Sequence, residues 1–535
     1  MSSRRHLFVF VCCGLAVLSH GCIYPSKETV PVGHTDVFKV PALELTEANE
    51  PNVIETESEI LPEELSLTLE ECRALALRNN LAIRATLMEP TLVAEQVSQE
   101  KAKFESVFQS SMSYRKSDDP SYSTLEGNKE NYWYGQFGLD TPLQTGGKVS
   151  LGLTDTRSKS DSGYWTMNPN YGSGLSFSLS QPLLRNAGSY VNRHSIRIVQ
   201  YQKNIAEARV RSEVTGLIRT VDGYYWGLYA LRKELEVRKS QYDLAEAQLE
   251  QTRRLVEQGQ VAQVEIIRAE AGLAERLEAI IIAQNNVQLQ ERGLKRVINK
   301  AGLGLESPNH LIPASEPAPV KYAFDTQHMV QVAVENRMEL LELEIQLAQD
   351  RSVMDYYRSQ SLPAVSLSYG YDHSGLGPSR REAYELLTSH QYGTEHSFGL
   401  NMEIPLGNQA AKHRLREAVY QKSQRLATQA SRKLMIKEEV LNAIDEVEAG
   451  WQRILASRHN AVTAGRQYEA EKRQFELGLR TNTEVLDAQA SLANAQSSEI
   501  RALADYQIAL EDLAYYTGTL LGAAQVEWEP ITPAS

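Results

Sequence analysis

Cysteine is scarce in this chain, which has four cysteines in 535 residues. Cys12 and Cys13 lie in an N-terminal segment with the features of an export signal, and Cys22 stands at its end. If Cys22 is acylated, Cys72 is the remaining free thiol and no intrachain disulfide forms. Cys72 lies in an apolar pattern with helical spacing, so we expect it to be a small core residue.

Long apolar runs are also missing. The hydrophobic residues make up 42% of the chain, which is ordinary for a soluble protein and excludes a membrane protein with many spanning helices. The formal net charge is −13. An acidic chain is a poor candidate for binding nucleic acid, because phosphates need clusters of Lys and Arg.

Signatures of catalysis and of metal binding are missing as well. The sequence has no GxSxG, HExxH, GxGxxG or paired CxxC motif. Its eleven histidines are scattered and its nine methionines do not cluster. We therefore expect neither an enzyme nor a bound cofactor or metal.

The N-terminus predicts export. Two arginines precede an apolar run of twelve residues, 7–18, which is too short to cross a bilayer. The run ends at SHGC (19–22), which resembles a bacterial lipobox, although a leucine stands one position too early and the histidine is unusual. We expect residues 1–21 to be a signal peptide and Cys22 to be lipidated.

One stretch of twenty residues occurs twice, at 255–274 and at 474–493. The copies align without a gap, and seven of the twenty positions match. In each copy a long helical segment reaches a glycine, Gly259 or Gly478, and a second segment starts a few residues later. Glycine adopts the positive φ that ends a helix. The duplication therefore predicts two helical hairpins.

The second copy carries a start signal for its second helix. Thr481-Asn482-Thr483-Glu484 fits a capping box, in which Glu484 reaches back to Thr481. The first copy has Ala262 at the cap position and lacks that cap. An ordinary helix connection would explain one copy alone.

Six runs alternate between apolar and polar residues, the period of a strand with two different faces. Their length is typical of a tilted membrane strand, about 9–11 residues, although a soluble sandwich gives the same alternation. Polar loops are expected at 115–130, 157–170 and 372–397. The apolar positions are 104, 108, 112 and 114; 133, 137 and 139; 149, 151 and 153; 171, 175, 177 and 179; 365, 367, 369 and 371; and 398, 400, 402 and 404.

Proline marks the exit from the strands in both halves, at Pro182 and Pro405, because it cannot continue a strand ladder. From about 192 to 257 and from about 409 to 477 the chain has no proline and little glycine. At ~1.5 Å per residue each segment makes a helix about 100 Å long. Helical patterns return over 263–300 and 482–517. The first long segment follows the coiled-coil period, with Leu228, Leu235, Tyr242, Leu249 and Val256 seven residues apart.

These patterns divide the chain into six parts. The mature chain begins with an acidic tether, and two halves with the same order of elements follow, joined by a proline-rich linker. The expected bounds are 1–21 for the signal, 22–66 for the tether, 67–306 for the first half, 307–322 for the linker, 323–521 for the second half and 522–535 for a disordered tail.

This organisation resembles the outer-membrane efflux protein family, the TolC-like channels, over about 67–518. The most specific feature is the repeated glycine turn, followed at fixed offsets by an acidic residue, Leu or Ile, and Ala. The resemblance implies an α+β membrane protein: a homotrimer with one outer-membrane β-barrel, about four strands per chain, continued by a coiled-coil barrel across the periplasm. It also implies a passive exit duct of a tripartite efflux or type I secretion system, joined by a periplasmic adaptor to an inner-membrane pump of RND or ABC type.

One feature departs from the family. The resemblance predicts two strands per half, whereas the first half has four candidates, including an extra hairpin near 131–156. This hairpin either enlarges the barrel or lies outside the membrane band, and we expect the latter.

The resemblance places a pore gate at the hairpin tips. Its acidic ring falls on Glu484 and Asp487, and its tethering contacts fall on Arg480 and Glu265. Three chains would bring six carboxylates together, which would attract cations and raise some carboxylate pKa values. The alternative is that Glu484 only caps a helix and that Asp487 faces solvent.

The same tips would dock the helical hairpin of the adaptor, through the surface around Gly259, Gly478, Val261 and Leu479. The alternative to a channel is a coiled-coil envelope lipoprotein without a pore. That alternative explains the long helices and the acyl anchor. It does not explain amphipathic strands in both halves.

Overall fold

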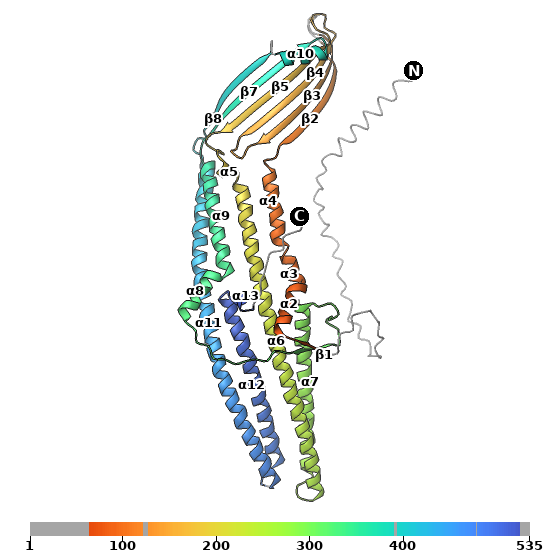
Figure 1. Ribbon diagram of the computed structural model, residues 1–535, viewed down its shortest axis with the longest axis vertical. Coiled ribbons are helices and arrows are strands. Elements are labelled where there is room, and N and C mark those ends of the chain that lie inside the picture. Colours follow the sequence, from red (N-terminus) through yellow and green to blue (C-terminus); the bar gives the residue numbers. More distant parts are fainter. Residues whose placement is uncertain (1–63, 121–126, 390–392, 478, 525–535) are drawn as a thin grey trace, which may run out of the picture. The chain divides into compact units, whose positions relative to one another are not determined.

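A computed structural model describes residues 64–524, except 121–126, 390–392 and 478 (Figure 1). The expected signal peptide, Cys22, most of the tether, most of the tail and Gly478 lie outside the described residues. Within the described ranges no helix has both the length and the apolarity to cross a bilayer. Nor do these ranges hold a group of three His, Cys, Asp or Glu side chains suited to a metal ion.

All six alternating runs fall in one antiparallel sheet, as Figure 1 shows. Its order is β2-β3-β4-β5-β7-β8. Every strand reaches into a range that was expected to be a polar loop, β8 included, since it begins at Thr394. The strands are β2 (Val107–Asp118), β3 (Lys129–Pro142), β4 (Lys148–Ser160), β5 (Asn170–Pro182), β7 (Ala364–Gly377) and β8 (Thr394–Glu403).

The register places the apolar residues of all six strands on one face. One row across the sheet pairs Phe108 with Leu139, Leu139 with Leu151, and Leu151 with Phe177. The row continues through Tyr371, and directly opposed residues share a face. This face is uncovered over much of its area, since Phe398 is 79% and Met112 65% exposed. The other face carries mainly Ser, Thr, Gly and Gln.

The extra hairpin is not set apart from the other strands. β3 and β4 pair with each other and, along nearly their whole lengths, with β2 and β5. The hairpin that was expected to lie outside the membrane band is therefore an inner part of the sheet, which has six strands rather than about four. The local alternation predicted the hairpin, but its place depends on pairing with strands on both sides.

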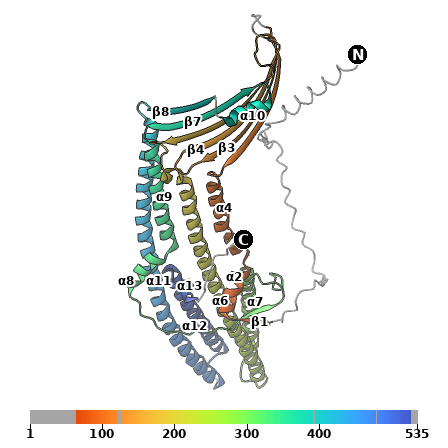
Figure 2. The same ribbon diagram turned by 45° about the horizontal axis from the view of Figure 1, so that its top comes forward.

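A short helix, α10 (Arg380–Ser389), lies in the range 372–397 that was expected to be a loop. It packs on β7 and β5 (Figure 2). Ser173 of β5 donates a hydrogen bond to the backbone oxygen of Ala383 at 2.8 Å. Gly375 of β7 lies directly under the same turn, where an added Cβ would collide with the backbone of α10.

The long helices have the predicted bounds to within a few residues. α6 (His194–Glu257) has 64 residues and α11 (Gln409–Glu476) has 68. α7 (Val264–Ile298) returns along α6, and α12 (Asn482–Tyr516) returns along α11. The shorter helices are α2 (Leu69–Asn79), α3 (Leu81–Thr86), α4 (Glu89–Ala102), α5 (Ser189–Asn192), α8 (Thr326–Asn336), α9 (Met338–Gln360) and α13 (Leu520–Ala523).

Two short strands lie where the sequence predicted none. β1 (Glu64–Leu67) ends the range assigned to the tether, and β6 (His310–Pro313) lies in the proline-rich linker. The two strands are parallel and pair along their whole lengths. This pairing fixes the start of the first half to the linker. The capping box of Thr68 and Glu71, which starts α2, follows directly after β1.

The helical part has two main apolar cores. The first joins α2, α6 and α7 around Tyr225, Leu228 and Ile298. Cys72 belongs to this core, as predicted, and burial raises the pKa of its thiol to about 12. The second core joins α8, α11 and α12 around Ile436 and Tyr506.

Candidate functional site

The first hairpin tip joins α6 to α7 through a glycine turn. Gly259 has φ of 72°, a conformation that glycine adopts without a Cβ penalty. Its N–H donates to the backbone oxygen of Val256 at 2.9 Å, which ends α6 as predicted. α7 starts at Val264 and has no side-chain cap, as predicted, although its N-cap residue is Gln263 rather than Ala262. Gly478, at the second tip, lies outside the described residues.

The second tip has the predicted capping box. The backbone N–H of Thr481 donates to the carboxylate of Glu484 at 2.8 Å. Arg480 donates to the other carboxylate oxygen at 2.6 Å. The pKa of Glu484 is lowered, first by the bond from the Thr481 backbone and then by Arg480. In one chain Glu484 is therefore a charged, half-exposed helix cap.

Asp487 lies one turn further along α12 and is exposed. Among the described residues its carboxylate has no ion-pair partner, and its backbone oxygen accepts a bond from Ser491 at 2.9 Å. Residues three apart on a helix lie on one face. The structure thus places the two predicted gate acids side by side at the start of α12.

The two predicted tethering residues find their partners within their own hairpins. Arg480 pairs with Glu484 and, at 3.2 Å, with Glu471. Glu265 pairs with Arg268 at 2.6 Å. One chain therefore brings neither of them to the opposite hairpin.

Other residues join the two hairpins, and the sequence interpretation missed them. Gln248 of α6 donates to Asn482 of α12 at 2.9 Å. Gln489 donates to the backbone oxygen of Gln241 at 3.2 Å. All four are buried. Gln241 and Gln248 are seven residues apart on α6, and Asn482 and Gln489 are seven residues apart on α12. This spacing was the available signal, since it repeats a polar side chain on one helix face.

The tips also expose apolar side chains. Leu477 and Leu479 of the second tip are 74% and 72% exposed. Ile267 and Val264 are exposed at the first tip, and Val261 is half-buried. Exposed apolar residues gathered at the end of a hairpin are typical of a protein–protein contact.

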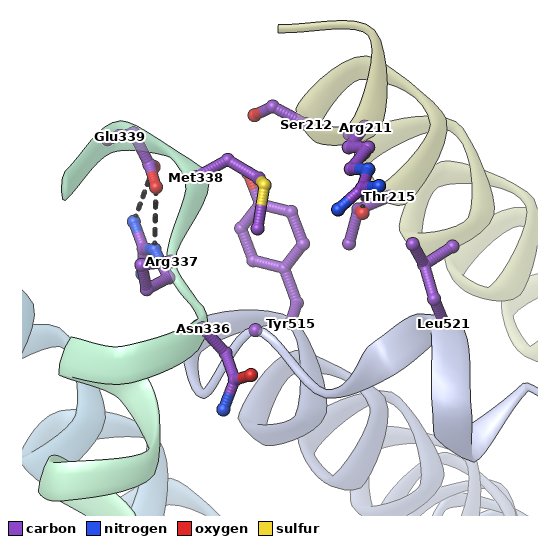
Figure 3. Close-up of a pocket in the computed structure, with 10 residues that line it drawn as sticks. Arg211, Ser212, Thr215, Asn336, Arg337, Met338, Glu339, Tyr515 and Leu521 are labelled. Atoms are coloured by element: carbon purple, nitrogen blue, oxygen red, sulfur yellow. Dashed lines mark hydrogen bonds and ion pairs between the residues drawn. The ribbon is translucent and has the colours of Figure 1, made fainter. Parts of the chain in front are cut away.

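A pocket lies away from the tips, where α6 faces the junction of α8 and α9 and the end of α12 (Figure 3). Arg337 on its wall donates to Glu339 at 2.7 Å and to Glu439 at 2.8 Å. Burial acts to raise the pKa of Glu339, but Arg337 outweighs it and lowers the value to about 2. These charged groups bind one another, so the pocket marks a helix junction.

Known proteins resemble most of the chain. The family model described as outer membrane efflux protein matches residues 148–300 and 329–519. The outer membrane protein TolC of Vibrio cholerae is 22% identical over 318 residues, which are 59% of this chain and 70% of that protein. The alkaline protease secretion protein AprF of Pseudomonas aeruginosa is 23% identical over 344 residues, 60% of this chain and 66% of that protein.

Solved structures share the fold. A membrane protein from Pseudomonas aeruginosa aligns with a TM-score of 0.63 and 16% identity, over 89% of this chain and 99% of its own. The CmeC outer membrane channel of Campylobacter jejuni aligns with a TM-score of 0.61 and 16% identity, over 90% and 94%. With the family match over most of the chain, these likenesses lead to one conclusion: the chain belongs to the outer membrane efflux protein family.

Proposed function

We propose that three copies of this chain form an outer-membrane exit duct, which passively releases substrate delivered by an inner-membrane pump through a periplasmic adaptor. The observation that carries the proposal is the six-stranded sheet with one exposed apolar face. In lipid, every backbone polar group needs a partner, so a membrane sheet must close. In the part that the structure describes, no strand pairs with the outer edges of β2 and β8. Joining those edges between copies would close a barrel.

The hairpins continue the duct on the other side of the membrane. Helices of 64 and 68 residues have lengths of about 100 Å at ~1.5 Å per residue, a length suited to a tunnel across the periplasm. An acyl group on Cys22 would anchor the chain further.

The gate is proposed at the second tip. Three copies would bring Glu484 and Asp487 together as a ring of six carboxylates, which attracts cations. Arg480 sits beside Glu484 and partly offsets its charge. Glu265, paired with Arg268, lies in the first turn of α7 and would face a neighbouring copy. Capping and gating are compatible roles for Glu484.

The adaptor is proposed to dock at the exposed tips, through Gly259, Gly478, Val261 and Leu479. The pump would be of the RND or the ABC type. A bulky substitution at Gly478 is expected to abolish export while trimers persist. Loss of the trimer in that variant would instead make Gly478 a folding residue.

The test is conductance in planar bilayers. The protein purified in detergent should give a small, cation-preferring conductance, and the Glu484→Ala/Asp487→Ala variant should give a larger one with weaker preference. Glu246→Ala/Glu257→Ala is the matched control, because it removes two exposed acids of α6 outside the proposed ring. Its conductance should equal that of the unmodified protein.

Two results would change the proposal in different ways. If both double variants conduct like the unmodified protein, the duct stands and the gate lies elsewhere. If no protein conducts, although a folded trimer is verified, the chain is a structural envelope lipoprotein rather than a channel.

A further inference from the structure

A cluster of cations lies on the apolar face of the sheet, beyond the apolar side chains and at the end away from the helices. Lys116 of β2 and Lys159 of β4 are both paired with Asn131 of β3, which places them in one row. Arg157 lies two residues before Lys159, on the same face. All three side chains are exposed.

Three acids at this end of the sheet already have partners. Asp118 lies 4.0 Å from Lys129, and Asp155 lies 3.0 Å from Arg380 of α10. Asp161 accepts a hydrogen bond from the backbone N–H of Lys129 at 2.9 Å. Among the described residues, Lys116, Arg157 and Lys159 have no ion-pair partner. The guanidinium of Arg157 lies 5.8 Å from the centre of the Tyr171 ring.

Aromatic side chains separate the two lysines from the apolar residues, and Arg157 lies among the aromatic side chains. The next row of the sheet holds Tyr114, Trp133, Arg157 and Tyr171. Arg380 lies over the ring of Trp133 at 5.2 Å. Aromatic girdles of this kind stand at the boundary between acyl chains and headgroups in membrane sheets. The order along the face is therefore apolar, aromatic, cationic, which matches the order of acyl chain, interface and headgroup in a lipid.

The spacing suits a phosphate. Neighbouring strands lie about 4.8 Å apart and residues two apart on a strand lie about 7 Å apart. The backbones of the three cations thus lie within roughly 12 Å of one another, and their long side chains can converge. We propose that Lys116, Arg157 and Lys159 bind the phosphate of a lipid headgroup in the outer leaflet. This inference rests on the proposed function, since it needs the sheet to lie in the membrane.

The test measures lipid retained by the detergent-purified protein with native mass spectrometry. The probes are dioleoylphosphatidic acid, dioleoylglycerol, which has the same chains without the phosphate, and inorganic phosphate. The unmodified protein should retain phosphatidic acid in preference to dioleoylglycerol, and inorganic phosphate should not compete. Lys116→Gln/Lys159→Gln should lower retention of phosphatidic acid by roughly tenfold.

The sheet offers a matched control. Arg115→Gln/Lys148→Gln also removes one cation from β2 and one from β4, but these lie on the opposite face and pair with Glu130 and Asp140. It should retain lipid like the unmodified protein. Equal losses in the two double variants, no preference for the phosphate, or full competition by inorganic phosphate would each overturn the inference.

Conductance of the same preparations separates this inference from the duct. A channel that conducts without preferring the phosphate lipid keeps the duct and removes the headgroup site. A protein that retains the lipid through Lys116 and Lys159 but never conducts keeps the site and removes the duct.

Discussion

The two halves of the chain place similar helices in the same order but fix them with different chemistry. In the first half, Arg73 of α2 binds Asp222 of α6 at 2.7 Å and Glu511 of α12 at 2.8 Å. In the second half, Arg337 at the start of α9 binds Glu339 and Glu439 of α11. Both arginines are buried. Each anchors a short helix to the long helix of its half.

The difference lies in what remains when the arginine is removed. Asp222 is 1% exposed, and no second cation pairs with it in the part of the chain that the structure describes. Glu339 and Glu439 are less buried, and Arg432 also binds them, at 3.2 and 3.4 Å. The first junction therefore depends on one arginine, whereas two arginines share the acids of the second. The two halves thus share an architecture, but their junctions depend on different numbers of arginines.

The largest expected effect comes from breaking the first junction. Arg73→Met should lower the free energy of unfolding by on the order of 3–5 kcal/mol, because it leaves a buried carboxylate unpaired. Arg337→Met should cost less than half of that, because Arg432 remains. The measurement is urea-induced loss of helical circular dichroism in detergent.

A double variant checks that the cause is the unpaired charge. Arg73→Met/Asp222→Leu should recover most of the stability, since an apolar pair of similar volume replaces the ions. Burial already raises the pKa of Asp222 to about 6, against the opposing effect of Arg73. In Arg73→Met the deficit should therefore shrink as the pH falls and the carboxyl takes up a proton. Equal deficits in the two single variants would show that the junctions do not differ.

A smaller effect should distinguish the second junction by its acid response. Arg337 lowers the pKa of Glu339 to about 2, from a usual value of 4.5. A lowered folded-state pKa contributes stability that is present above pH 4.5 and is lost as the pH falls through about 2. Solvent weakens this contribution, because Glu339 is partly exposed. Glu339→Gln should flatten the dependence of the melting temperature on pH between 4.5 and 2, and Glu335→Gln, an exposed acid of α8, should not.

The sequence predicted the elements whose signals are local. Alternation located all six strands, and the absence of proline located α6 and α11. The pairing of β1 with β6 and the place of the extra hairpin were missed because both depend on segments far apart in the chain. α10 was missed because its place depends on a residue outside the helix: Gly375 of β7 leaves the space in which the backbone of Ala383 lies.

The candidate site divides in the same way. The capping box of Thr481 and Glu484 was predictable, since its residues lie within one turn. The contact between Gln248 and Asn482 was not, because it depends on which faces of the two hairpins meet. The polar and apolar faces of each helix can be predicted from the sequence. Which of these faces contact each other depends on how the two hairpins pack.

The smallest expected effect compares the two tips directly. Thr481→Ala removes the hydroxyl that binds Glu484 at 3.1 Å, and losing such a cap costs about 1 kcal/mol. Hydrogen exchange followed by mass spectrometry should show faster exchange at residues 482–485. Gln263→Ala, at the start of α7, should change exchange at 264–267 little, because Gln263 makes no cap bond. If Thr481→Ala changes exchange at 482–485 no more than Gln263→Ala changes it at 264–267, packing rather than capping fixes the start of α12. Glu484 would then be free to serve the gate alone.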